Sequence, residues 1–168
     1  MTSTAPTTQP NQQSPQVKLL SPIKLLEQLS TINNREHTPI PTKSQLFFIT
    51  GMQNLDKNMK SAGEKLTASV AEAEKSKEEE QLAVSYLGLG YFYYLKQEVD
   101  KTLQLYQASL EIWNGIHKDN QLKLTELLLD LSKLYELQNN KSDFEQTITR
   151  CNEIYKKNGK DDKIIKLN

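Results

Sequence analysis

The most regular pattern in the chain runs from Leu82 to Trp113, where two apolar stripes flank a short polar break at residues 96–100. Within each stripe the apolar residues recur every three or four positions, which places them on one face of an α-helix. The break has the length of a tight turn, so the stretch predicts two antiparallel helices. The remainder of the chain is organised around this helical hairpin.

A further apolar stripe lies before the hairpin, again with spacings of three and four residues. It predicts helical structure over residues 42–75. Thr42 and Gln45 have the form of a capping box at the start of this region. Ser76 and Glu79 have the same form and predict the start of the next helix. The stripe consists of Phe48, Met52, Leu55, Met59, Ala62, Leu66, Val70 and Ala73.

Gly63 leaves two interpretations of this region open. It is either the turn of a hairpin with helices over 44–61 and 64–75, or a close-packing point in one continuous helix, where a glycine costs only about 1 kcal/mol. The unbroken stripe favours one helix, whereas the repeat described below favours a turn, and we slightly prefer the hairpin. A coiled-coil contact with another chain is less favoured, because the stripe covers fewer than four heptads.

The N-terminal residues have a different character. Residues 1–16 contain no charge, no aromatic ring and no Leu, Ile or Val, so they predict disorder. Ser21 and Pro22 are typical of a helix start, and the short helix that they predict is stable only when it docks on the domain or on a partner. We therefore expect a disordered Ser/Thr/Pro/Gln-rich tail over 1–20, a short helix and Pro-bounded linker over 21–41, a helical domain over 42–158 and a charged tail over 159–168.

Residues 84–117 have a counterpart in residues 126–158, which indicates an internal repeat. Tyr93 and Tyr135 are 42 positions apart. Gly90 and Ser132 are both small, as expected where two helices approach closely. The matched positions are Tyr86, Leu89, Gly90, Tyr93, Val99, Tyr106 and Leu110 against Leu128, Leu131, Ser132, Tyr135, Phe144, Cys151 and Tyr155.

The last predicted helix begins at a capping box of Ser142 and Glu145 and ends at Asn158 and Gly159. Cys151, the single cysteine, lies at a core spacing on this helix. A small buried side chain is favoured over a reactive thiol, because no histidine lies near it in sequence to activate it. One cysteine also excludes an intrachain disulfide and favours a reducing, intracellular setting.

The repeat resembles a tetratricopeptide repeat, well over 84–117, fairly over 126–158 and weakly over 44–75, and its 42-residue spacing is similar to the longer repeats of kinesin light chains. The resemblance implies an all-α fold of stacked antiparallel helical hairpins, a short right-handed α-solenoid. About three such repeats are usually needed for stability, so we expect 44–75 to be a degenerate first repeat. The matching pattern is Tyr86, Leu89, Gly90, Tyr93, Val99, Thr102, Tyr106 and Ser109, with departures at Thr102, Asn114, Thr147 and Ile154.

In this family the inner faces of the first helices line a concave groove that binds partner peptides. The Lys and Asn set with which chaperone-binding members hold a terminal carboxylate has no match here, because Lys133 stands alone. The aromatic residues at 91–94 cannot all share one helix face, and burial under another helix is favoured over a binding role for those that point away from Gly90. The resemblance places Leu87, Tyr91, Tyr94, Leu95, Leu129, Lys133, Glu136 and Leu137 in the groove, and Tyr86, Leu89, Gly90, Tyr93, Tyr106, Leu131, Ser132, Tyr135 and Phe144 in repeat packing.

Charge and motifs narrow the expected function. The chain has 21 basic and 21 acidic side chains, so it has no general attraction for nucleic acid or an anionic membrane. No apolar run approaches the ~20 residues of a membrane helix. No phosphate-binding, zinc-hydrolase or nucleophile-elbow motif occurs, so we expect no enzyme activity, no cofactor and no metal. Glu126 and Asp130 are interpreted as solvated charges, and Trp113 and His117 as packing residues.

These features predict a cytoplasmic, or nuclear, adaptor or scaffold that binds a peptide or helix of a protein partner. The alternative is a structural subunit or assembly factor whose incomplete repeat array is completed by self-association, as in a homodimer, or by a larger complex. The helix predicted over 22–33, or the apolar residues of the C-terminal tail, are possible covers for the groove or for one end of the array.

Overall fold

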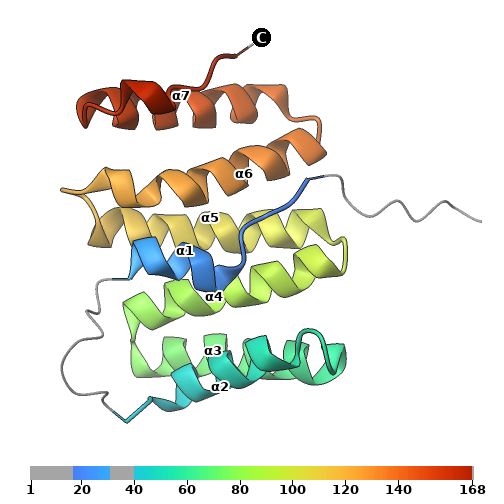
Figure 1. The fold of residues 1–168 in the computed structure, drawn as a ribbon. Coiled ribbons are helices and arrows are strands. Elements are labelled where there is room, and N and C mark those ends of the chain that lie inside the picture. The colour runs from blue at the N-terminus through green and yellow to red at the C-terminus, as the bar shows by residue number, and fades with distance from the viewer. Residues whose placement is uncertain (1–16, 31–39, 168) are drawn as a thin grey trace, which may run out of the picture.

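The computed structural model describes residues 17–30 and 40–167, and within those ranges the chain is helical and contains no strand. Three antiparallel hairpins stack on one another along the chain (Figure 1). The predicted all-α architecture of stacked hairpins is therefore confirmed. The helices are α1 (Pro22–Leu29), α2 (Lys43–Asn54), α3 (Met59–Ser76), α4 (Glu79–Leu95), α5 (Val99–Ile116), α6 (Thr125–Leu137) and α7 (Lys141–Lys157), with short 3-10 turns η1 (Gln121–Leu124) and η2 (Asp161–Lys163).

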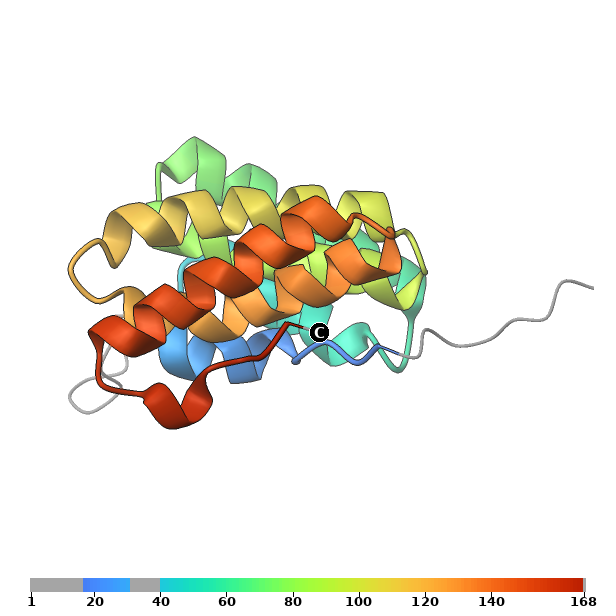
Figure 2. The ribbon, with the colours of Figure 1, turned by 90° about the horizontal axis from the view of Figure 1, so that it is seen from above.

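The short N-terminal helix lies outside the stack of hairpins and packs on α4 and η1. Figure 2 shows α1 and the segment that leads into it along one side of the stack, with α3 and α5 on the opposite side. The N-cap prediction is confirmed, because the Ser21 hydroxyl accepts a hydrogen bond from the Lys24 N–H. The last residues of the predicted helix, 31–33, fall outside the described residues.

One hydrogen bond recurs in all three hairpins and shows that α2 and α3 form a repeat like the others. In each hairpin a small polar side chain of the second helix donates to a backbone carbonyl near the start of the first helix. Because the same contact joins each helix pair, the predicted hairpin over 44–75 is confirmed as a third unit of the stack. The three pairs are Ser69 Oγ with the Ser44 carbonyl at 2.8 Å, Ser109 Oγ with the Ala83 carbonyl at 2.8 Å and Cys151 Sγ with the Thr125 carbonyl at 4.0 Å.

The turn of the first hairpin lies at residues 55–58 instead of at Gly63, so that part of the prediction was wrong. Asn58 starts α3, and its side chain accepts a hydrogen bond from the Ser61 N–H at 3.0 Å. Gly63 lies inside α3, where a Cβ atom would come within 2.6 Å of Cζ of Phe92 on α4. Its role is the close packing considered as the alternative, and the turn is set by Asn58.

The helix ends confirm some predicted caps and contradict others. The capping box of Thr42 and Gln45 is present, and Gly159 ends α7 in the left-handed conformation. Ser76 does not cap α4, because it is the last residue of α3 and donates to the Glu72 carbonyl. The N-cap of α7 is Asn140, which accepts from the Asp143 N–H, and not Ser142.

Several residues predicted to pack the repeats are buried, among them Leu89, Leu131 and Tyr135. A Cβ atom at Gly90 would lie 2.7 Å from Cδ1 of the fully buried Tyr106, so the α4–α5 contact requires a residue without a side chain. Tyr86, Tyr93 and Phe144 are half-buried. No helix in the described part of the chain is long and apolar enough to cross a membrane.

Candidate peptide-binding groove

The first helices of the second and third hairpins, α4 and α6, place most of the predicted groove residues on protected surface. Leu87 and Tyr94 are buried, and Tyr91 and Lys133 are half-buried. Leu129 and Leu137 are also half-buried, whereas Leu95 and Glu136 are exposed. Tyr94 and Lys133 are protected in part by residues 17–30 of the same chain, which we call the N-terminal segment.

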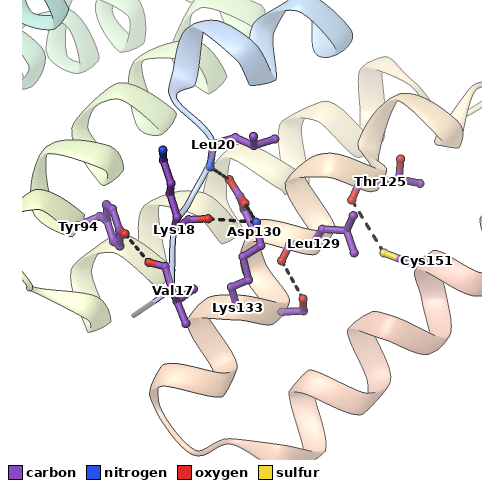
Figure 3. Close-up of polar contacts among 10 residues, drawn as sticks. Val17, Lys18, Leu20, Tyr94, Thr125, Leu129, Asp130, Lys133 and Cys151 are labelled. Carbon is purple, nitrogen blue, oxygen red and sulfur yellow. Dashed lines mark hydrogen bonds and ion pairs between the residues drawn. The ribbon is translucent and has the colours of Figure 1, made fainter. Parts of the chain in front are cut away.

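The extended start of the N-terminal segment is held through its main chain (Figure 3). Tyr94 Oη of α4 donates a hydrogen bond to the Val17 carbonyl at 2.5 Å. Lys133 Nζ of α6 donates to the Lys18 carbonyl at 3.3 Å. The Leu20 N–H donates to Oδ2 of Asp130, also on α6, at 2.8 Å. Two helices from different hairpins therefore bind three backbone groups of one extended stretch of the chain.

The leucines of the segment supply its apolar contact with the domain. Leu19, Leu25 and Leu29 are 2%, 0% and 1% exposed, although the helix that carries two of them has only eight residues. A helix of this length is not stable alone in water, so its order depends on this docking. Burial of each leucine contributes about 1.5–3 kcal/mol toward the docked state.

The C-terminal end of α1 is fixed by two basic side chains. His117 Nε2 contacts the Leu29 carbonyl, and Lys123 Nζ donates to the Ser30 carbonyl at 3.3 Å. The imidazole is itself positioned by a parallel stack on the buried Trp113 ring, with centroids 5.4 Å apart. The predicted packing role of these two rings is thus joined by a second role for His117, at the end of α1.

Asp130 corrects the sequence analysis, which interpreted it as a solvated charge. Its side chain is fully buried, and burial raises the pKa of the carboxyl group, while the hydrogen bond and charge of Lys133 and the N–H of Leu20 act to lower it. Lys133 Nζ lies 2.7 Å from Oδ1. The carboxylate is buried because both of its oxygen atoms have donors, one from α6 and one from the N-terminal segment.

The aromatic residues of α4 contact different neighbours. Phe92 is buried against Gly63 of the first hairpin, and Tyr94 contacts Val17 of the N-terminal segment. Tyr91 is 5.7 Å from Tyr94 between ring centroids, and burial, followed by the charges around it, raises the pKa of its hydroxyl. Tyr93 lies beside Lys101, 4.7 Å from its ring centroid. The aromatic surface on the groove side is therefore that of Tyr91 and Tyr94.

Neither Asp130 nor residues 17–20 were among the predicted site residues, although the sequence carried a signal for Asp130. Asp130 precedes Lys133 by three positions and Leu137 by seven, which places it on the same helix face as these two predicted groove residues. Val17–Leu20 were assigned to the disordered tail. They are held in place because Leu19 is buried and because Tyr94 and Asp130 form hydrogen bonds with their backbone. Residues 1–16 lie outside the described part of the chain.

The polar side chains on this surface can form hydrogen bonds with a peptide backbone. The groove offers one hydroxyl donor, one ammonium donor and one carboxylate acceptor to a peptide backbone, beside surface that takes up leucine side chains. Within the described residues, no group of three or more His, Cys, Asp or Glu side chains is arranged to hold a metal ion.

Comparison with known proteins supports the repeat assignment. Residues 81–157 match a family model described as tetratricopeptide repeat, and this span covers the second and third hairpins. The first hairpin and the N-terminal segment lie outside the match. No curated protein and no solved structure shows a significant match to the chain.

Proposed function

We propose that the chain is a non-catalytic protein-protein interaction module, an adaptor or scaffold, whose groove on α4 and α6 binds a peptide of a partner protein. The tetratricopeptide match over 81–157 supports the general class. The observation that carries the proposal is the N-terminal segment itself, because the groove already holds a peptide of its own chain.

The bound segment indicates what kind of peptide the groove takes. Its extended residues are contacted at two backbone carbonyls and at one backbone N–H. Every residue offers the carbonyl, and every residue except proline offers the N–H. Specificity then comes from the leucines at positions 19, 25 and 29, which are at most 2% exposed. The preferred ligand is an extended stretch that continues into a short helix with leucines at this spacing.

A partner peptide has to displace the N-terminal segment from the same contacts. The segment is covalently attached, so it competes at an effective concentration in the millimolar range, and the observed affinity of a partner is lowered accordingly. The groove is thereby protected from non-specific apolar contacts until a ligand of higher affinity is present.

The alternative of a structural subunit with an incomplete repeat array is less well supported. Only two repeats are evident in the sequence, but the hairpin of α2 and α3 supplies a third helix pair. The N-terminal segment also covers groove surface that another subunit would otherwise have to cover.

A displayed library of random peptides tests the proposal. The full chain carrying Leu25→Asp, which places a charge at a fully buried position of α1, should capture peptides more readily than the wild type. The matched variant Gln28→Asp, which introduces the same charge at an exposed position of α1, should behave like the wild type. Circular dichroism of both variants should show the helical signal of the wild type, which is the control for an intact domain. Captured peptides should be displaced by a synthetic Val17–Ser30 peptide, and a library that yields no such peptides would contradict the proposal.

A further inference from the structure

A second groove lies on the outer side of α1, and it is separate from the surface that holds the N-terminal segment. It runs between α1, α2, the first two turns of α4 and η1, and has a volume of about 1140 Å³. This is at or above the upper end of the roughly 300–1,000 Å³ typical of small-molecule sites, so its size suits several side chains of a macromolecular partner. We call it the outer groove.

Each of the four elements that form the outer groove contributes at least one apolar side chain to its floor. Ile23 and Leu26 come from α1, Phe48 and Ile49 from α2, Val84 from α4 and Leu122 from η1. Ile23 is 58% exposed and Ile49 is 44% exposed. Ile23 and Ile49 come from different elements and both line the groove. Exposed apolar side chains that share one groove mark an interaction surface, because scattered single ones are the norm.

Among the residues that the structure describes, those at the rim of the outer groove carry an excess of negative charge. Four glutamates line it, Glu27 on α1 and Glu78, Glu79 and Glu80 around the start of α4. Lys123 is the only basic residue among the described lining residues, and its ammonium group donates to the Ser30 carbonyl. Glu78 accepts hydrogen bonds from Thr42 and Ser44, which position its carboxylate without neutralising its charge.

We propose that the outer groove binds an amphipathic helix of a partner protein, with apolar side chains three or four residues apart and Lys or Arg beside them. The apolar floor fits the helix stripe, and the acidic rim fits the flanking cations. A helix is favoured over an extended peptide because a helix satisfies its own backbone hydrogen bonds, whereas an extended backbone on the apolar floor would depend on the amide side chains of the lining, such as Gln28 and Gln45.

The outer groove exists only while α1 is docked, since α1 contributes Ile23, Leu26 and Glu27 to one wall. A helix bound there adds contacts to the docked state of the N-terminal segment, whereas a peptide in the groove on α4 and α6 requires that segment to leave. The two ligands therefore oppose each other. The outer groove does not depend on the proposed function, because it needs no displacement of the N-terminal segment.

Two labelled synthetic peptides test this inference by fluorescence anisotropy on the full chain. Both form an amphipathic helix with the same leucine stripe, and they carry either Lys or Glu on the flanks of the stripe. The Lys peptide should bind at least about tenfold more tightly, and added salt should reduce the difference. Equal affinities for the two peptides would overturn the proposed partner chemistry.

Surface variants locate the binding site. Glu27→Lys and Ile49→Asp should each weaken the Lys peptide by about tenfold or more, because they reverse a rim charge and place a charge on the floor. Glu111→Lys on α5 and Met59→Asp on α3 make the same changes at exposed positions away from the groove and should have no effect. Binding that responds equally to all four variants would overturn the assignment to this groove. So would a concentration-dependent dimer that Ile49→Asp dissociates, because a second copy of the chain would then be the occupant.

Discussion

The buried carboxylate of Asp130 accepts a hydrogen bond from the backbone N–H of Leu20 at 2.8 Å, although the two residues are 110 positions apart in the chain. This bond joins the third hairpin to the N-terminal segment, while Tyr94 joins the second hairpin to it through Val17. The segment thus spans two repeats and couples them. Docking of residues 17–30 should stabilise the repeat stack as well as fill its groove.

Asp130 predicts a specific pH dependence. Burial raises its pKa in the folded chain above the value of about 3.9 expected in the unfolded chain. Between the unfolded and the folded pKa the folded state retains a proton that the unfolded state has lost, so the contribution of Asp130 to stability falls as pH rises through the folded pKa. Asp130→Asn does not titrate. Urea unfolding at several pH values should show the wild type losing stability relative to this variant as pH rises, and the opposite trend would mean that the ion pair with Lys133 outweighs burial.

Removal of a leucine from α1 should destabilise the whole domain. Leu25 is completely buried, and Leu25→Ala should lower the free energy of unfolding by about 2–5 kcal/mol. Gln28→Ala on the exposed face of the same helix should change it by less than about 0.5 kcal/mol. Both values come from urea unfolding of the full chain. Equal effects of the two substitutions would mean that α1 contributes nothing to stability in solution.

Two helical glycines should respond in opposite ways to alanine. Gly90→Ala places a methyl group 2.7 Å from the buried Tyr106 ring and should cost about 1–3 kcal/mol through overpacking. Gly115→Ala in α5 meets no atom within 4 Å and should stabilise the chain by about 0.5–1 kcal/mol through its better helix propensity. Thermal unfolding of both variants measures these changes in stability. A stabilised Gly90→Ala protein would show that the α4–α5 contact is looser than described.

Cys151 should be unreactive in the folded protein. Burial raises the pKa of its thiol to about 12, so almost none of it is thiolate at neutral pH. A thiol reagent should modify it only when the domain unfolds, and the rate should rise with urea in parallel with the loss of helix. Rapid modification in buffer alone would contradict its buried position against Thr125.

Most of the fold followed from periodic residues, because helical hairpins are specified locally. The stripe from Phe48 to Ala73 and the matched positions Tyr93 and Tyr135 identified helices that the structure contains. The turn of the first hairpin was misplaced because glycine is permissive both in turns and at close contacts, and in this chain Gly63 serves the second purpose against Phe92. The signal that sets the turn is Asn58, a helix-capping residue whose role depends on a single hydrogen bond.

The groove was harder to predict than the fold, because its present state depends on contacts between distant parts of the chain. Lys133 was placed in the groove from the family pattern, but its bond to the Lys18 carbonyl joins residues 115 positions apart. The spacing of Asp130 and Lys133 places both on one helix face, but the Leu20 N–H that donates to the Asp130 carboxylate comes from 110 positions away, and no local pattern reveals that contact. A short helix such as α1 is not stable alone in water, and its own sequence does not indicate where it docks.

The most direct test of the account is to cut the folded protein within the connection at residues 31–39 and to measure binding of a labelled Val17–Ser30 peptide. The cut removes the advantage of covalent attachment, so the peptide should bind to the cut protein and bind far more weakly to the intact one. A peptide with Leu25→Asp should fail to bind, and one with Gln28→Asp should bind like the unchanged peptide. If the peptide does not bind to the cut protein, or binds equally well with Leu25→Asp, the groove on α4 and α6 is not the peptide-binding site that we describe.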